Sequence, residues 1–400
     1  MKLGALFSPK LAMGVQGRKE SLERITKHFS KKDKVIWMHA ASLGEYEQGL
    51  PVLEKLQSEF NDHKVLVTFF SPSGYEVAKK KPQENRFLAY LPFDTPKEID
   101  QLLSAVHPTV FFTVKYDFWY VLFEKLAKKG VPIYVVSALF YPGQVFFSWW
   151  GKFAVERLKR DVKWFFHQTQ ESLDLATMVG LTRSSVSGDT RFDRVRKTAR
   201  EAGQILYIDE FKGDSPLVVY GSSWEEEENI ALAIFQQDQS VKQIIAPHDL
   251  SRVPQILKKF PEAKLYSELS SSNAASMLSG RVLIIDSIGM LSRLYQYADI
   301  AVVGGGFHSK GLHNILEAAV FGVPVLFGNH YRKNPEADDL VHCKGAEKFS
   351  TSDQAVAFIK RLVEDHELRD YLGGAAEKFI NSSPVSTEMI VQHIISEVRS

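Results

Sequence analysis

Short apolar runs that end in glycine or polar turns alternate along the chain with segments of helical periodicity, such as Tyr46 to Glu59. This alternation is typical of parallel sheets covered by helices, because strands buried on both faces read as continuous apolar runs. In the first half the predicted strands are Val35 to His39, Val65 to Phe70, Val110 to Val114, Ile133 to Ser137 and Trp164 to Gln168. In the second half they are Leu217 to Tyr220, Gln243 to Ala246, Val282 to Ile285, Ile300 to Val303 and Val325 to Phe327.

The pattern starts twice, which predicts an α/β protein with two Rossmann-like, doubly wound domains. A chain of 400 residues also exceeds what one hydrophobic core usually organises. Open α/β sheets bind ligands beyond the carboxyl ends of their strands, so we expect the domains to face each other across a cleft. The polar segment Arg194 to Asp214 is the expected linker. The expected divisions are residues 1–200, residues 201–385, and a helix in residues 386–400 that packs back on the first domain.

Composition narrows the classes of function. The hydrophobic fraction of 44% and the charged fraction of 24% are those of a folded globular chain, and a net charge of +1 argues against a nucleic-acid partner. Cys343 is the single cysteine, which excludes an internal disulfide and a thiolate metal cluster and fits a reducing compartment.

The amino-terminal segment is rich in bases. Its apolar stretch between Lys2 and Lys10 is shorter than the roughly 20 residues that span a bilayer. From Lys10 to Lys34 bases outnumber acids, which fits an anionic lipid surface or, equally, a solvated helix face.

Glu45 is the candidate catalytic residue. It follows the strand Val35 to His39 and a turn of small residues that contains Ser42 and Gly44, so it is expected beyond the carboxyl end of that strand. A carboxylate there can accept a proton from an attacking hydroxyl group. Glu45 is also well placed to cap the following helix, and both interpretations stand at this point.

A glycine-rich loop follows the strand Ile300 to Val303. Gly305 and Gly306 allow close approach of the backbone to a phosphate, Lys310 adds a positive charge, and a helix is expected from the loop through Phe321. Glu317 lies one helical turn beyond His313 and Asn314, where it could accept the hydroxyl groups of a ribose.

Other loops at strand ends offer further polar groups. Ser222, Ser223 and His248 follow strands of the second half, and a turn containing Ile288, Gly289 and Met290 could read a nucleobase through its backbone. In the first half Lys115, Tyr116 and Asp117 follow a strand, and Arg191 precedes the linker. Together with Ser42 and Gly44, these four are the expected acceptor-binding residues. Lys115 and Arg191 could bind anionic groups of a substrate, or form ordinary ion pairs with Asp117 or Asp193.

The segment from Phe140 to Trp150 is unusually rich in aromatic residues and is followed by the bases Lys152, Arg157, Lys159 and Arg160. It could contact acyl chains and headgroups, or form a buried corner of the core.

Several of these motifs together resemble the family of 3-deoxy-octulosonate (Kdo) transferases of lipopolysaccharide synthesis, in order and spacing over nearly the whole chain. The stretches that carry the resemblance are Met38 to Glu45, Tyr90 to Asp94, Asp117 to Trp119, Gly188 to Asp193, Gly304 to Glu317 and Ala318 to Gly328.

The resemblance implies a GT-B architecture and an inverting transfer of Kdo from CMP-Kdo to a lipid A precursor, without a cofactor or a catalytic metal. It implies that Glu45 is the general base. It also implies that Gly305, His313, Asn314 and Glu317 belong to the donor-nucleotide motif, with Ser222, Ser223 and His248 in the other donor-side loops.

This chain departs from the family pattern at three positions. The family usually carries an acidic residue where Lys115 stands, a second one near Asp117, and a proline where Tyr120 stands. The family's amino-terminal membrane anchor is shortened, so we expect peripheral attachment to the cytoplasmic face of the inner membrane through basic and aromatic surfaces.

Two alternatives remain open on sequence alone. One is another GT-B enzyme, a UDP-sugar transferase or an epimerase, and the other is a nucleotide-sugar binder without turnover. The number of Kdo residues transferred and the oligomeric state also stay open.

Overall fold

The computed structural model describes residues 9–80, 85–270, 279–309, 311–331 and 334–399. The chain forms two compact units. The amino-terminal unit comprises Met1–Arg194 and Pro384–Ser400, and the carboxyl-terminal unit comprises Val195–Ser383. The division lies within helix α8 (Thr190–Arg200), a few residues before the expected boundary at 200/201.

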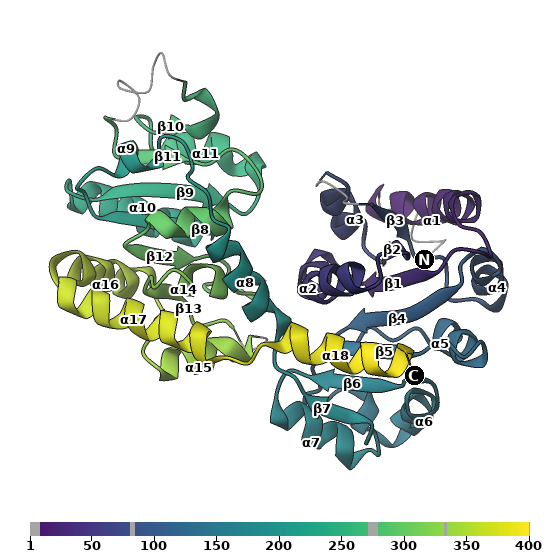
Figure 1. The fold of residues 1–400 in the computed structure, drawn as a ribbon. Coiled ribbons are helices and arrows are strands. Elements are labelled where there is room, and N and C mark those ends of the chain that lie inside the picture. The colour runs from purple at the N-terminus through teal and green to yellow at the C-terminus, as the bar shows by residue number, and fades with distance from the viewer. Residues whose placement is uncertain (1–8, 81–84, 271–278, 310, 332–333, 400) are drawn as a thin grey trace. The chain divides into compact units, whose positions relative to one another are not determined.

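The amino-terminal unit is built on a parallel sheet of seven strands in the order β3-β2-β1-β4-β5-β6-β7 (Figure 1). Its strands are β1 (Val35–Ala40), β2 (Lys64–Phe69), β3 (Arg86–Tyr90), β4 (Pro108–Val114), β5 (Ile133–Ala138), β6 (Trp164–His167) and β7 (Ser184–Val186). Its helices are α1 (Pro9–His28), α2 (Leu43–Glu59), α3 (Pro72–Lys79), α4 (Pro96–Ala105), α5 (Tyr120–Lys128), α6 (Lys152–Asp161), α7 (Gln170–Met178), the start of α8 and α18 (Ser386–Arg399).

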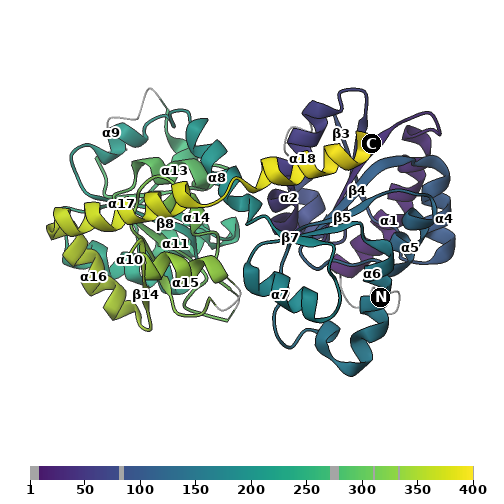
Figure 2. The same cartoon turned by 60° about the horizontal axis from the view of Figure 1, so that its bottom comes forward.

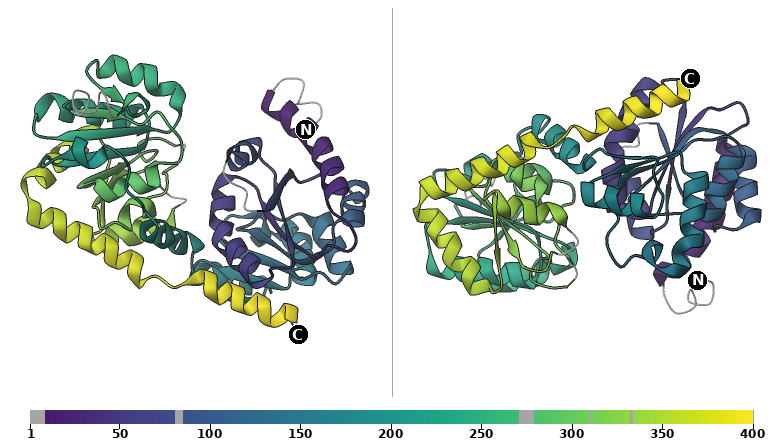
Figure 3. Two further views of the ribbon diagram at one scale, coloured as in Figure 1. Left: turned by 45° about the horizontal axis from the view of Figure 1, so that its top comes forward. Right: turned by 90° about the horizontal axis from the view of Figure 1, so that it is seen from below.

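Helices cover both faces of this sheet because alternate residues of each strand point to opposite sides. Trp37 of β1 belongs to a core packed against α1, α4, α5, α6 and α7. Its neighbour Met38 belongs to a second core, packed against α2, α3 and α18. The helix α18 therefore lies beside α2 on the amino-terminal unit, as Figures 2 and 3 show.

The carboxyl-terminal unit repeats the plan with a parallel sheet in the order β10-β11-β9-β8-β12-β13-β14. Its strands are β8 (Leu217–Ser223), β9 (Lys242–Pro247), β10 (Lys264–Leu265), β11 (Val282–Ile284), β12 (Ile300–Val303), β13 (Val325–Gly328) and β14 (Ala346–Phe349). Its helices, after α8, are α9 (Ile208–Lys212), α10 (Glu225–Gln237), α11 (Val253–Lys259), α13 (Leu291–Leu294), α14 (Leu316–Ala319), α15 (Pro335–His342), α16 (Ser352–Glu364) and α17 (His366–Ser382).

All ten predicted strands are present, and the α/β, doubly wound class is confirmed. The four strands that the sequence pattern missed, β3, β7, β10 and β14, are the edges of the two sheets. Edge strands have a neighbour on one side only and tolerate polar residues, as in Ser184–Val186, so they do not read as long apolar runs.

The helix predicted after the glycine-rich loop begins later than expected. The chain stays irregular from Gly304 to Asn314 within the described residues, and α14 covers only Leu316–Ala319. In the described part of the chain, no helix combines the length and the apolar character needed to cross a membrane.

The packing of α18 predicts the effect of a core substitution. Ile394 is fully buried against the sheet, so Ile394→Ala should lower the free energy of unfolding of the amino-terminal unit by about 2–5 kcal/mol. Urea unfolding followed by tryptophan fluorescence measures this, because all tryptophans except Trp224 belong to that unit. The exposed neighbour Met389→Ala should change stability by less than about 0.5 kcal/mol. Equal effects of the two substitutions would contradict the packing.

Candidate functional site

Glu45 lies where the topology predicts, in the first turn of α2 just beyond the carboxyl end of β1. Its side chain is half-buried, and the hydroxyl of Ser42 donates a short hydrogen bond to Glu45 Oε2. Ser42 precedes the helix in an extended conformation, yet its side chain makes no capping bond to the backbone. Gly44 is exposed, and a Cβ there would meet only Ser42 Oγ at 3.8 Å. The carboxylate is thus held by a side-chain hydroxyl.

The carboxylate of Asp117 is committed to a buried network. Asp117 Oδ2 lies 2.8 Å from His39 Nε2 and accepts a hydrogen bond of 3.0 Å from the indole N–H of Trp119. The other ring nitrogen of His39 lies 2.9 Å from the hydroxyl of Thr68, which also accepts from the indole of Trp37 at 2.9 Å. Burial alone raises the pKa of Asp117, but the charge of His39 and these hydrogen bonds lower it below its ordinary value. Asp117 therefore ties the turn after β4 to the end of β1.

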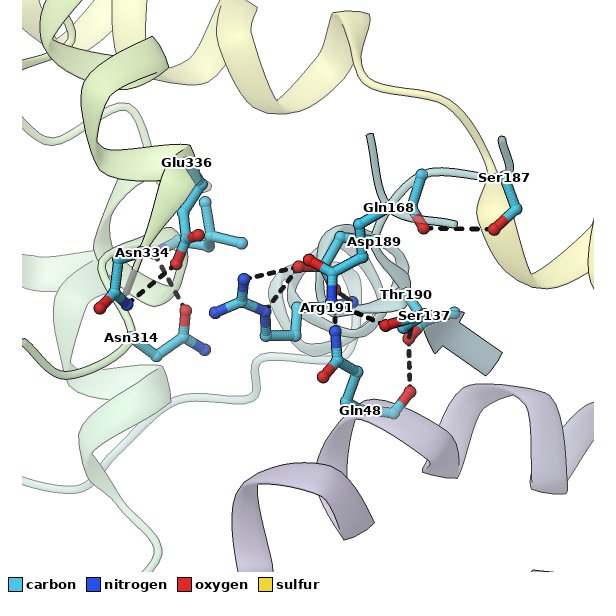
Figure 4. Close-up of polar contacts among 12 residues, drawn as sticks. Gln48, Ser137, Gln168, Ser187, Asp189, Thr190, Arg191, Asn314, Asn334 and Glu336 are labelled. Carbon is cyan, nitrogen blue, oxygen red and sulfur yellow. Dashed lines mark hydrogen bonds and ion pairs between the residues drawn. The ribbon is translucent and has the colours of Figure 1, made fainter. Parts of the chain in front are cut away.

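Arg191 is paired with Asp189, a partner that the sequence analysis did not name. The Asp189 carboxylate accepts from Arg191 Nε at 2.7 Å and from Gln48 Nε2 at 2.6 Å, as Figure 4 shows. Asp193 instead accepts from the backbone N–H of Thr387. Burial raises the pKa of Asp189, but the guanidinium of Arg191 outweighs it and the pKa lies below its ordinary value.

Lys115 also belongs to this cluster, because its charge helps to lower the pKa of Asp189. Its backbone adopts a left-handed conformation with φ of 62°, directly after β4. Beside it, the hydroxyl of Thr190 contacts Ser137 Oγ at 3.1 Å and bonds to the carbonyl of Gln48 (Figure 4). The cluster thus joins α2, β5 and the start of α8. Gln48 and Asp189 were missed because they lie 141 positions apart in the chain.

The aromatic segment after β5 divides between the two expected roles. Phe140 and Phe146 are buried in the core, whereas Trp149 and Trp150 are 83% and 61% exposed. Part of the segment is thus a core corner, and part is an exposed apolar surface.

In the carboxyl-terminal unit, Glu227 of α10 was missed by sequence reasoning although it organises the candidate donor side. It is fully buried, and its carboxylate accepts from the backbone N–H groups of Trp224 at 2.8 Å and Gly305 at 3.1 Å. Burial raises the pKa of Glu227 to about 7, against the lowering effect of these hydrogen bonds. Since β8 and β12 are neighbours, one carboxylate ties together the loops that follow both strands.

The glycines after β12 serve close packing of the backbone. A Cβ on Gly304 would lie 2.0 Å from the carbonyl oxygen of Ser222, and one on Gly306 would lie 2.6 Å from the backbone of Gly328. Gly305 has a φ of 93°, which favours glycine, and its N–H is engaged by Glu227. The N–H of Gly305 is therefore already paired within the protein.

Imidazole rings gather next to this loop. The ring of His248 stacks on Trp224 at a centroid distance of 4.5 Å and lies 4.6 Å from the ring of His313. The ring of His308 lies edge-on to Trp224 at 4.7 Å. Burial, together with the charges of His248 and His308, lowers the pKa of His313 to about 4, so His313 is neutral at pH 7.

The remaining donor-side candidates lie in turns. Asn314 Nδ2 donates to Glu317 Oε1 at 3.2 Å, while Asn314 Oδ1 accepts from the N–H of Leu316. Figure 4 also shows Asn334 donating to the buried carboxylate of Glu336 at 3.1 Å, a pair absent from the sequence prediction.

The other candidate donor-binding residues differ in burial and backbone conformation. Ser223 is fully buried, and its hydroxyl finds no hydrogen-bond partner among the described residues. Ser222 has a φ of 51°, Ile288 is exposed, Gly289 has a φ of 96°, and Met290 Sδ accepts from Ser287 at 3.0 Å. Lys310 lies outside the described residues. Within the described ranges, histidine, cysteine and acidic side chains form no group of three that could hold a metal ion.

Residues 16–194 match the family described as 3-deoxy-D-manno-octulosonic-acid transferase (kdotransferase). A 3-deoxy-D-manno-octulosonic acid transferase of Aquifex aeolicus is 27% identical over 318 residues, covering 78% of this chain and 80% of that protein. A bifunctional glycosyltransferase/methyltransferase of Fusobacterium nucleatum is also 27% identical, over 77% of this chain, which spans only 49% of that longer protein.

Among solved structures, the UDP-GlcNAc 2-epimerase of Neisseria meningitidis bound to UDP-GlcNAc superposes with a TM-score of 0.61 at 15% identity. The alignment covers 91% of this chain and all of the epimerase chain. At this identity the likeness concerns the fold, which is of the GT-B type.

The buried Glu227 predicts a pH dependence of stability. The pKa of Glu227 in the folded chain, about 7, exceeds its ordinary value of 4.5. The contribution of its carboxyl group to the free energy of unfolding is therefore complete below pH 4.5 and is lost as the pH rises through 7. The total loss is about 3 kcal/mol. Glu227→Gln should flatten this slope in urea unfolding between about pH 5 and pH 8, whereas Glu225→Gln, at an exposed position of the same helix turn, should keep it. An unchanged slope in Glu227→Gln would contradict the assignment.

Proposed function

Because the chain belongs to the 3-deoxy-D-manno-octulosonic-acid (Kdo) transferase family and is a glycosyltransferase, we propose that it moves Kdo from CMP-Kdo to a lipid A precursor. The reaction inverts the anomeric carbon in a single displacement. A hydroxyl oxygen of the acceptor forms the new bond to that carbon, the bond to the CMP phosphate oxygen breaks, and CMP leaves with the electron pair.

The observation that carries the proposal is the placement of Glu45 within the region that matches the family. Its carboxylate is half-buried beyond β1, and one oxygen accepts from Ser42, which leaves the other oxygen able to take the proton of the acceptor hydroxyl. The hydroxyl of Ser42 orients the base. In this account the amino-terminal unit binds the acceptor.

We assign the carboxyl-terminal unit to the donor. Neutral His313 and the linked pair Asn314–Glu317 present hydrogen-bonding groups next to the loop that Glu227 holds. A neutral imidazole can donate or accept, and the Glu317 carboxylate can accept ribose hydroxyls. Ser222, Ser223, His248, Gly306, Lys310 and the turn of Ile288, Gly289 and Met290 complete the proposed donor set.

Charges for the anionic groups of the substrates come from Lys115 and Arg191. Arg191 shares its charge with Asp189, so the two cations and one carboxylate leave a net charge of +1 in this cluster. Because the Arg191 guanidinium is already held by Asp189, its side chain loses less conformational entropy when it binds a carboxylate or phosphate.

An exposed surface of the same unit suits a membrane. Trp149, Trp150 and Phe153 project from the segment that enters α6, and the guanidinium of Arg157 lies 4.6 Å from the ring of Phe153. Aromatic rings with adjacent bases favour the interface of an anionic bilayer. We infer a peripheral attachment to the cytoplasmic face of the inner membrane, where a lipid acceptor is reached.

The assignment of Glu45 as the base predicts a large kinetic effect. Glu45→Gln should lower kcat for acceptor-dependent CMP release by about 100- to 10,000-fold, with little change in KM, because the amide cannot take the proton. Glu59→Gln, at the other end of α2, is the matched control and should behave like the wild type. Activity of Glu45→Gln within about threefold of the wild type would exclude the proposed base.

The membrane surface predicts a binding effect. The double substitution Trp149→Ser and Trp150→Ser should lower binding to vesicles with anionic lipid by about tenfold or more, since two exposed aromatic rings that would enter the membrane interface are lost. Vesicle sedimentation measures this, and Met178→Ser, which removes another exposed apolar side chain of this unit, is the control. If the double tryptophan variant sediments with vesicles as well as the Met178→Ser control does, the proposed membrane surface is contradicted.

A further inference from the structure

Two exposed tyrosines lie at neighbouring strand ends next to Glu45. Tyr116 follows β4 and Tyr141 follows β5, and these two strands pair in parallel. β4 also pairs in parallel with β1, after which Glu45 comes. Because the carboxyl ends of parallel neighbours meet at one edge of a sheet, the two tyrosines and the carboxylate come from three adjacent positions along that edge.

The two rings contact each other, and both side chains are partly exposed to solvent. Their centroids lie 6.1 Å apart at an angle of 83°, which makes an edge-to-face corner. Tyr116 is 41% exposed and Tyr141 is 48% exposed. Burial, Tyr141 and the charge of Glu45 raise the pKa of Tyr116, which agrees with a carboxylate close to the corner.

Both tyrosines stand on backbone that is held in place. Tyr116 lies between Lys115, whose N–H donates to Val136, and Asp117, which is anchored by His39. Tyr141 follows the buried Phe140, whose N–H donates to Ser172 Oγ at 2.7 Å. A rigid pair of rings costs little entropy to order on binding.

The chemistry of this corner fits a sugar ring. A pyranose has an apolar face of C–H groups, which gains from burial on an aromatic ring, and a rim of hydroxyls, which pair with phenol and carboxylate groups. An acyl chain has no hydroxyl groups that could pair with the carboxylate and phenol groups at this place. The mixture of ring faces and acceptors therefore selects a carbohydrate.

We propose that Tyr116 and Tyr141 form a stacking corner that binds the pyranose ring of the acceptor whose hydroxyl Glu45 deprotonates. The inference deepens the proposed function and rests on it for the identity of the acceptor. Tyr141 lies in the aromatic segment that the sequence assigned to acyl chains or to the core, and here it binds a sugar ring instead.

Binding without turnover is the first test. A water-soluble, deacylated lipid A precursor is titrated against the full chain by saturation-transfer NMR in the absence of donor. Tyr141→Ala and Tyr116→Ala should each weaken binding about tenfold, which corresponds to the loss of one stacked ring, and Tyr141→Phe should recover most of it. Tyr371→Ala, an exposed tyrosine of α17 outside the proposed sites, should bind like the wild type.

Steady-state kinetics are the second test. Tyr141→Ala should raise KM for the acceptor about tenfold and leave KM for CMP-Kdo unchanged. Equal binding by wild type, Tyr116→Ala and Tyr141→Ala overturns the stacking corner even if the wild type transfers Kdo. Wild-type binding that the alanine variants lose, without any Kdo transfer, supports the corner and contradicts the proposed function instead. A wild type that binds no sugar overturns the corner.

Discussion

The parallel pairing of β1 with β4 is the constraint on which the proposed acceptor side depends. Its register places His39 opposite Thr113, so Glu45 after β1 and Lys115–Asp117 after β4 emerge at the same edge of the sheet. The contact between the buried His39 and Asp117 then fixes the turn, since removing Asp117 takes the partner from a ring nitrogen of a fully buried histidine. The position of Tyr116 beside the carboxylate of Glu45 follows from these two contacts.

In each unit, carboxylates join segments that are distant in the chain. The effect of the surroundings on the pKa of the carboxyl group differs between the two units. Asp117 and Asp189 have basic partners, and their pKa values lie below the ordinary value. Among the described residues, Glu227 accepts from backbone N–H groups alone, which do not offset its burial, and its pKa rises to about 7. The loops of the proposed donor side are therefore tied by a group that is close to changing its charge at neutral pH.

The sequence predicted what depends on local periodicity. Strands buried on both faces, such as Ile300 to Val303, were recognised from their continuous apolar residues, and the position of Glu45 followed from the strand before it. Edge strands such as β7 were missed because their polar residues carry no such signal.

Contacts between side chains that are distant in the sequence could not be predicted from the pattern of apolar and polar residues. Nothing near Arg191 distinguishes Asp189 from Asp193 as its partner, and nothing near Glu227 indicates that it binds the N–H of Gly305, 78 positions away. Such contacts depend on the topology of the sheet. The same holds for Tyr116 and Tyr141, which meet only because β4 and β5 are neighbours.

Kdo transfer is tested most directly by the mass of the lipid product after the full chain is incubated with CMP-Kdo and a tetraacylated lipid A precursor. We expect the acceptor to gain the mass of one or more Kdo residues and CMP to be released in equal amount. An acceptor of unchanged mass, with turnover of a UDP-sugar under the same conditions, would contradict it.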